Sequence, residues 1–133
     1  MAEDSLEVVG RWAEAIQRGD LADDLWDPDL EIVNAEGWAL EATYRGHDGL
    51  HRWWNDLEEA FSEFRLEVEE VAPIDAERVL TTQRFVGRFR TTDIPFDGAW
   101  ASVLTVRDGR IVQAVGYLSK RRAMRALEEE RAG

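Results

Sequence analysis

Residues 98–118 constrain the fold more strongly than any other stretch of this sequence. Two segments with β-strand character, 98–107 and 110–118, flank Asp108-Gly109, a dipeptide that two-residue hairpin turns prefer. Side chains alternate between the two faces of a strand. The alternation predicts one shared face on each strand: Trp100, Ser102, Leu104 and Val106 on the first, and Ile111, Gln113, Val115 and Tyr117 on the second. The sequence therefore predicts a β-hairpin over residues 98–118.

Helical and strand periods divide the rest of the chain into further elements. The spacing of apolar residues predicts a helix over 3–18, a short helical piece over 21–25, strands over 30–34 and 38–44, a helix over 47–61, strands over 64–72 and 77–90, and, after the hairpin, a C-terminal helix capped by Ser119. No repeat or low-complexity linker interrupts this order, so we expect one domain over residues 1–133. Helices beside a mostly antiparallel sheet make an α+β domain.

The composition excludes several classes of protein. The chain has no cysteine and a net charge of −12, so disulfides are impossible and a phosphate backbone is repelled. It has neither an apolar run long enough for a membrane span nor the basic start of a signal peptide. We therefore expect a cytoplasmic protein that binds neither nucleic acid nor membranes.

The segment YRGHDGLHRWW, residues 44–54, contains both histidines of the chain and resembles a zinc-peptidase helix. Such a site needs a longer carboxylate than Asp48 and a third ligand, and no third histidine exists. The alternative interpretation is a helix that plugs a hydrophobic core, because Trp53 and Trp54 fall on its apolar stripe with Leu50 and Leu57. We favour the core helix and expect no metal site.

Four passages resemble the nuclear transport factor 2-like superfamily and, within it, the SnoaL-like polyketide cyclase branch. They are RGD with DPDLEI (18–20 and 27–32), YRGHDGLHRWW (44–54), VLTTQRFVGR (79–88) and ASVLTVRDGRIVQAVGYLSKRRAM (101–124). The resemblance covers about residues 5 to 128. It implies a cone, in which a curved sheet of about six strands wraps on the N-terminal, middle and C-terminal helices around a pocket. It also implies homodimers that form through the outer face of the sheet.

The resemblance does not select one activity, because relatives include ketosteroid isomerases, polyketide cyclases, dehydratases, epoxide hydrolases and binding domains. The family often carries Tyr-x-Asp before its last helix, where this chain has Tyr117-Leu118-Ser119, which puts a role for that carboxylate in doubt. Epoxide hydrolysis fits poorly, because the sequence offers no evident Asp-Arg-Asp group around a water.

The predicted strand faces give a set of pocket residues. Ligand pockets are mostly apolar with a few placed polar groups. We expect a small hydrophobic molecule to be bound by aromatic residues with two polar points: Trp38, Tyr44, Trp54, Trp100 and Tyr117, with Asn34 and Ser102. The alternative is that these side chains fill the cone completely.

Candidate catalytic groups are few. Proton transfer needs a carboxylate or histidine near a hydrogen-bond donor. His47, at the edge of the helix stripe, and Asp97, in the predicted loop TTDIPFDG, are the candidates. The alternation over residues 79–86 is ambiguous, so Arg84 or Arg88 could bind an anionic group inside the cone, although we favour the outer face of the sheet for both. Three functions stay open: a cofactor-free isomerase, cyclase or dehydratase, a non-catalytic pocket protein for hydrophobic ligands, and a dimeric accessory domain with a filled cone.

Overall fold

The structure, a computed structural model, describes residues 4–35 and 43–132. Its elements follow the predicted order. They are α1 (Ser5–Gln17), a 3₁₀ helix η1 (Asp23–Leu25), β1 (Trp26–Val33), β2 (Thr43–Arg45), α2 (Gly46–Ala60), β3 (Phe61–Pro73), β4 (Arg78–Phe89), β5 (Pro95–Arg107), β6 (Arg110–Tyr117) and α3 (Lys120–Ala132). The predicted α+β class is confirmed. None of the described helices is long and apolar enough to span a membrane.

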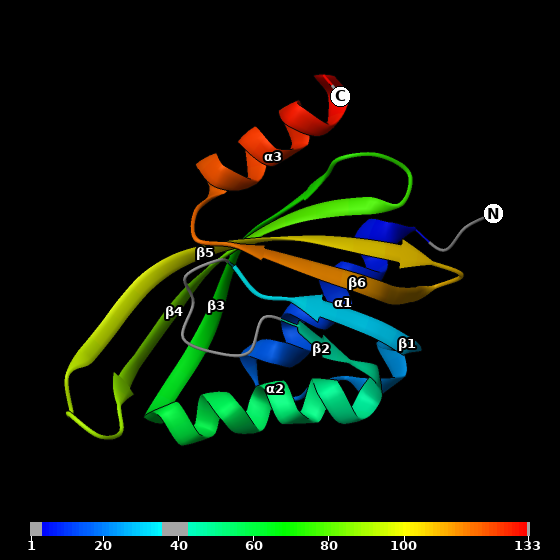
Figure 1. The fold of residues 1–133 in the computed structure, drawn as a ribbon. Helices are drawn as coiled ribbons and strands as arrows, with labels where there is room; N and C mark the ends of the chain where they lie inside the picture. The colour runs from blue at the N-terminus through cyan, green and yellow to red at the C-terminus, as the bar shows by residue number, and fades with distance from the viewer. Residues whose placement is uncertain (1–3, 36–42, 133) are drawn as a thin grey trace.

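The six strands form one sheet in the order β2-β1-β6-β5-β4-β3. Every neighbouring pair is antiparallel except β1 with β6, which run parallel. Figure 1 shows the long strands β3, β4 and β5 bending strongly toward the side where α2 lies, while α3 lies on the opposite side of the sheet. The bend makes one face of the sheet concave, and the helices α1 and α2 cover that face.

Local sequence explains where the elements begin and end. The Asp4 carboxylate accepts a hydrogen bond from the backbone N–H of Leu6 at 2.9 Å and caps α1. The Ser119 hydroxyl accepts one from Arg122 N–H at 3.1 Å and caps α3, as predicted. Asp108 and Gly109 have φ angles of 51° and 76°, the positive values that a type I′ turn requires. The closing hairpin is therefore confirmed in detail.

Three strand boundaries differ from the prediction. β1 begins at Trp26 and runs through Pro28, because the pairing with β6 shifts register between Trp26 and Glu31. An interrupted ladder does not need the N–H that proline lacks. β3 begins at Phe61, directly after α2, so the end of the predicted helix stripe belongs to a strand. β5 begins at Pro95, so Asp97 lies in a strand rather than in a loop.

The core has one large and one small part. The large part lies on the concave face, where α1 and α2 pack on the sheet and Phe85 is fully buried among aromatic rings, with ring centroids 4.7 Å from Phe61 and 4.8 Å from Trp100. The small part lies on the convex face, where Ala123 and Leu127 of α3 pack on the sheet residues Leu80, Ala101 and Val103. The sheet therefore contributes apolar residues on both faces.

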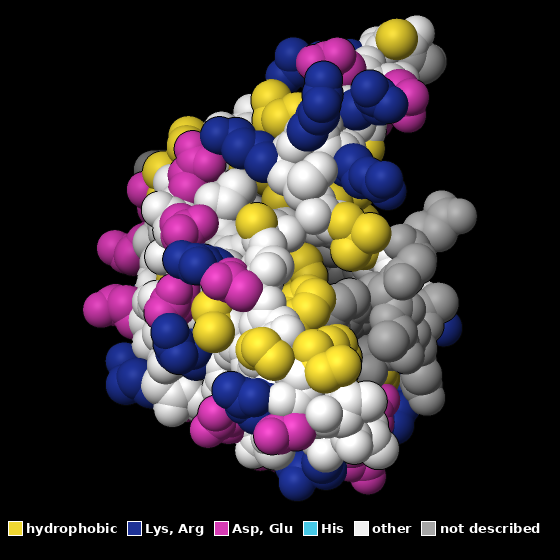
Figure 2. Space-filling model, turned by 90° about the vertical axis from the view of Figure 1, so that its left-hand side faces the viewer, with side chains coloured by type: hydrophobic (Ala, Val, Ile, Leu, Met, Phe, Trp, Pro, Cys, Tyr) yellow, Lys and Arg dark blue, Asp and Glu magenta, His cyan; other side chains and the backbone are white. Residues whose placement is uncertain are grey.

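The strand β4 resolves an alternation that is ambiguous in the sequence. The inward set is buried (Val79, Thr81, Gln83 and Phe85), whereas Arg84 is exposed. Arg84 pairs with Asp97 of β5, and Arg65 of β3 pairs with Glu67, so the outer face carries ion pairs within the chain. Figure 2 shows acidic and basic side chains along the left side and the lower part of the view, and hydrophobic side chains gathered near its centre.

Candidate functional site

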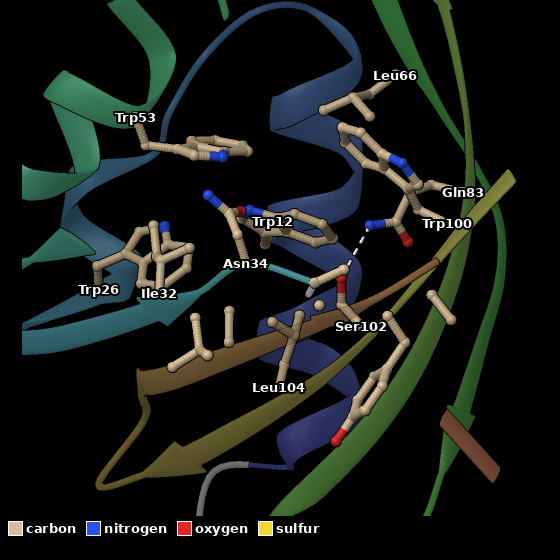
Figure 3. Close-up of a pocket in the computed structure, with 16 residues that line it drawn as sticks. Trp12, Trp26, Ile32, Asn34, Trp53, Leu66, Gln83, Trp100, Ser102 and Leu104 are labelled. Carbon is tan, nitrogen blue, oxygen red and sulfur yellow. Dashed lines mark hydrogen bonds between the residues drawn. The ribbon is translucent and has the colours of Figure 1, made fainter. Parts of the chain in front are cut away.

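A cavity of about 70 Å³ lies between the helices α1 and α2 and the concave face of the sheet. Four tryptophans from four elements line it: Trp12 of α1, Trp26 of β1, Trp53 of α2 and Trp100 of β5. Figure 3 shows their indoles around a common space, with the amide of Asn34 turned between Trp53 and Trp12 in this view. Apolar cavities of about 150 Å³ hold benzene in other proteins. This cavity therefore suits a small molecule, and a full ring requires side chains at its edge to move.

Small side chains on β6 leave the space open. Thr105 of β5 pairs with Gln113 of β6, and the next residue, Val106, pairs with Ile111. Val112 is therefore one extra residue on β6, which makes a β-bulge. The bulge reverses the alternation beyond it and turns Ala114 and Gly116 toward the cavity. The predicted shared face of β6 is therefore wrong, since Gln113 instead donates a hydrogen bond to Glu31 at 2.9 Å.

A buried chain of polar side chains ends at the cavity wall. The hydroxyl of Thr81, which is 0% exposed, donates to Oε1 of Gln83 at 3.0 Å. Nε2 of Gln83 donates in turn to the hydroxyl of Ser102 at 3.1 Å (Figure 3). Because the Ser102 oxygen accepts this bond, its own proton is directed elsewhere. The Ser102 hydroxyl therefore stays available as a donor, and Ser102 lines the cavity.

Charged groups are absent from the described lining of the cavity. Its residues include no Asp, Glu, His, Lys or Arg, and Tyr117 is the one titratable side chain among them. Burial raises the pKa of the Tyr117 hydroxyl above its ordinary value of 10.0, and the negative charge of Glu130 adds to the rise, while Arg78 opposes it. The phenol therefore keeps its proton at neutral pH and can act as a donor.

The predicted pocket residues divide into three groups. Asn34, Trp100, Ser102 and Tyr117 line the cavity together, although Tyr117 also packs against the small core under α3. Tyr44 and Trp54 do not line it. Trp38 lies outside the described residues.

Tyr44 and Trp54 occupy other parts of the core. Tyr44 is 0% exposed, and its hydroxyl donates to Asp56 of α2 at 2.6 Å. Its strand therefore directs the ring into the interface with α2. Trp54 packs edge-on against Phe64 with a centroid distance of 5.1 Å. Its place on the helix therefore turns it toward β3 and away from the cavity.

The two candidate catalytic residues lie away from the cavity. His47 is held by a hydrogen bond from its Nε2 to the backbone carbonyl of Trp26 at 3.0 Å. Asp97 is exposed and accepts a hydrogen bond from Arg84 Nε at 2.7 Å. That hydrogen bond, opposed by desolvation and helped by the charge of Arg84, lowers the pKa of Asp97 below its ordinary value of 3.8. A catalytic base needs the opposite shift, so neither residue is placed to act on a molecule in the cavity.

The two histidines do not form a metal site. His51 Nε2 donates to Asp23 at 2.6 Å, whereas His47 is bound to a backbone carbonyl, so the two rings have different partners. Over residues 4–35 and 43–132, the structure has no group of three His, Cys, Asp or Glu residues that could hold a metal ion. The segment 46–60 instead packs Leu50 and Leu57 into the large core.

Sequence patterns do not single out four of the cavity residues as pocket residues. Trp12 and Trp53 carry helical apolar spacing, which is typical of any core residue. Trp26 precedes Asp27-Pro28, which predicts a break rather than a strand. Gln83 lies on the strand whose alternation is ambiguous. To recognise Trp26 and Gln83 as pocket residues, one would have to know the register of the sheet, which the pattern of a single sequence does not contain.

The fold and the sequence agree on one family. The sequence model of the SnoaL-like domain matches residues 9–114, most of the chain. The chain belongs to the SnoaL-like family, within the nuclear transport factor 2-like superfamily. None of the curated proteins compared with this SnoaL-like chain matches it.

Solved structures share the fold at low sequence identity. A nuclear transport factor 2-like protein from Burkholderia thailandensis superposes with a TM-score of 0.81 at 21% identity, covering 94% of this chain and 98% of its own. A putative SnoaL-like polyketide cyclase from Jannaschia sp. gives 0.69 at 16% identity, covering 91% and 89%. TerC, crystallised with polyporic acid, gives 0.75 at 18% identity, covering 95% and 99%. At these identities the likeness establishes the fold alone.

Proposed function

We propose that this SnoaL-like protein binds a small, neutral, largely apolar ring compound in the tryptophan-lined cavity, without acid–base catalysis by the described residues. The observation that carries the proposal is the lining itself, in which the described residues supply four indoles and uncharged polar groups but no charged side chain. Apolar walls with a few placed donors are typical of ligand pockets. The TerC structure, crystallised with polyporic acid, supports the idea that this fold can hold a small organic molecule.

The size of the cavity restricts the ligand. About 70 Å³ of free space is less than the roughly 300 Å³ at which drug-sized pockets begin. Trp53 and Trp100 are only half-buried, so their rings can adjust around an entering molecule. A single ring is therefore favoured over the polycyclic substrates that polyketide cyclases handle.

Binding is tested by thermal shift and tryptophan fluorescence with toluene, cyclohexanone and acetophenone. We expect at least one compound to raise the melting temperature and to quench the fluorescence, because bound ligand stabilises the folded state by mass action and contacts the indoles. If none of the three does either at millimolar concentration, the proposal is wrong.

The variant Ala114→Leu places an isobutyl side chain in the cavity. We expect it to abolish binding while the free energy of unfolding changes by less than about 1 kcal/mol, because the new side chain fills existing space. Ala99→Leu is the matched control, since Ala99 is exposed on the same sheet. Unchanged binding in Ala114→Leu would place the site elsewhere.

Proton transfer is the second candidate function, and Tyr117 is the observation that favours it. The Tyr117 side chain lines the cavity, and its protonated phenol, turned toward the cavity, would donate a hydrogen bond to a developing enolate while water accepted the proton from carbon. The reaction is tested with acetophenone in D₂O, where NMR follows exchange of its methyl protons. Exchange that exceeds the buffer rate, and that Tyr117→Phe removes, would make the protein an enzyme of the isomerase, cyclase or dehydratase type.

A homodimer formed through the outer sheet face is also part of the proposal. This face carries both charges, with pairs such as Arg84–Asp97 and Arg65–Glu67 that a second copy could re-pair across a two-fold axis. Sedimentation equilibrium should give twice the 15.2 kDa chain mass. A species of 15.2 kDa alone at micromolar concentration would contradict this part.

A further inference from the structure

The indole of Trp26 is a buried donor at the cavity. Its side chain is 3% exposed and lines the cavity, yet Nε1 has no hydrogen-bond partner among the residues that the structure describes. Figure 3 shows this nitrogen on the edge of the ring turned toward the space between Asn34 and Trp53 in this view. An indole N–H can only donate, so the group that satisfies it must accept.

The backbone holds Trp26 in this position. Its carbonyl accepts the hydrogen bond from His47 Nε2 at 3.0 Å, and the residue pairs with Ile111 of β6. The indole packs in the large core, so it cannot swing out to solvent without breaking these contacts. Buried polar groups in folded proteins are almost always paired, and an unpaired one destabilises the folded state. The N–H is therefore already desolvated and oriented before a ligand arrives.

We propose that the Trp26 indole N–H donates a hydrogen bond to the carbonyl oxygen of a neutral ring ketone or aldehyde. This inference rests on the proposed binding function and adds the chemical group that the site recognises. A carbonyl is favoured over a carboxylate because the described lining offers no cation and the chain carries a net charge of −12. A ligand without an acceptor would leave the buried donor unpaired.

Two nearly isosteric probes separate this hydrogen bond from shape. Acetophenone carries a carbonyl where α-methylstyrene carries a methylene group, and both are neutral planar rings. In ¹⁵N-labelled protein, the Trp26 indole cross-peak is identified by its loss in Trp26→Phe. We expect acetophenone to move that proton resonance downfield and α-methylstyrene to leave it nearly in place, because only the first can accept the bond.

Affinities of the Trp26→Phe variant complete the test. We expect acetophenone to bind about tenfold more weakly and α-methylstyrene to change by less than about twofold, since phenylalanine keeps an aromatic ring but lacks the donor. Trp12→Phe makes the same substitution at another lining tryptophan and should preserve the ratio of the two affinities. Circular dichroism checks that each variant is folded. If Trp26→Phe is not, triple-resonance assignment of the wild-type protein identifies the Trp26 cross-peak, and its response to the two probes decides the matter.

The outcomes distinguish this inference from the proposed function. If both probes bind the wild type equally well and Trp26→Phe weakens both alike, the cavity is a binding site and the Trp26 hydrogen bond is refuted. The hydrogen bond is also refuted if acetophenone binds without shifting the Trp26 resonance. If toluene binds the wild-type protein but neither probe does, the proposed function stands and this inference is refuted. If toluene, cyclohexanone and both probes all fail to bind, the proposed function fails, and this inference fails with it.

Discussion

Replacing Gln83 with leucine tests the buried polar relay behind the cavity. Gln83 is 5% exposed and links Thr81, at 3.0 Å, to Ser102, at 3.1 Å. Leucine removes the acceptor of the Thr81 hydroxyl, which is 0% exposed and has no access to water. An orphaned buried group costs about 1–3 kcal/mol, whereas Ser102 can reorient toward the cavity. We expect Gln83→Leu to lower the free energy of unfolding by about 2 kcal/mol, measured by urea unfolding.

A double-mutant cycle isolates the hydrogen bond from packing. Thr81→Val alone leaves the Gln83 carbonyl unpaired, but Thr81→Val with Gln83→Leu removes both partners together. Apolar replacement of both partners is close to neutral, so the double variant should lose at least about 1 kcal/mol less than the two single losses combined. Thr82→Val, on the other face of β4, is the control for the substitution itself. Additive losses within about 0.5 kcal/mol would refute the relay.

Three further predictions concern other sites. Gly87→Ala should lower the free energy of unfolding by about 1–3 kcal/mol, because the new Cβ would lie 2.8 Å from the Glu63 carbonyl oxygen. Gly10→Ala meets nothing within 4 Å and should stabilise α1 by up to about 1 kcal/mol. Equal effects of the two substitutions in thermal unfolding would contradict this prediction. Tyr44→Phe, which removes the 2.6 Å bond to Asp56 but keeps the ring, should lose about 1.5 kcal/mol in urea unfolding, and no loss would refute the contribution of that bond. The hydrogen bond with Arg84 lowers the pKa of Asp97 below its ordinary value of 3.8, so the pair stabilises the folded protein above about pH 4, and this stability is lost as the pH falls through the folded pKa. Asp97→Asn should therefore differ from the wild type in melting temperature at pH 7, and the difference should shrink as the solution is acidified; a difference that stays constant with pH would rule this out.

Much of the fold could be predicted from the sequence because its signals are local. Capping by Asp4 and Ser119, the positive φ angles at Asp108-Gly109 and the helical spacing of α1 depend on neighbouring residues only. The family follows from the order of such local passages. The start of β1 escapes prediction because proline normally breaks a strand, and only the bulge against β6 makes Pro28 acceptable there.

The site could be predicted only in part, because a cavity depends on register. Trp100 and Ser102 follow from simple alternation on β5. On β6 the extra residue Val112 reverses the alternation, so Ala114 and Gly116 rather than Gln113 and Val115 face the cavity. Tyr44 and Trp54 are pocket candidates by their aromatic character, which burial in a core explains equally well. Only the tertiary arrangement separates the two cases.

The parallel pairing of β1 with β6 has a consequence for synthesis of the chain. Glu31 and Gln113, partners across this pair, are 82 residues apart in sequence. While the ribosome is still adding the intervening residues, the nascent chain holds β1 with an unpaired edge and the tryptophans without their opposing wall. Closing so long a loop slows folding. A molecule that fits the cavity can therefore stabilise this fold only after translation has passed β6, because the cavity has no complete wall before then.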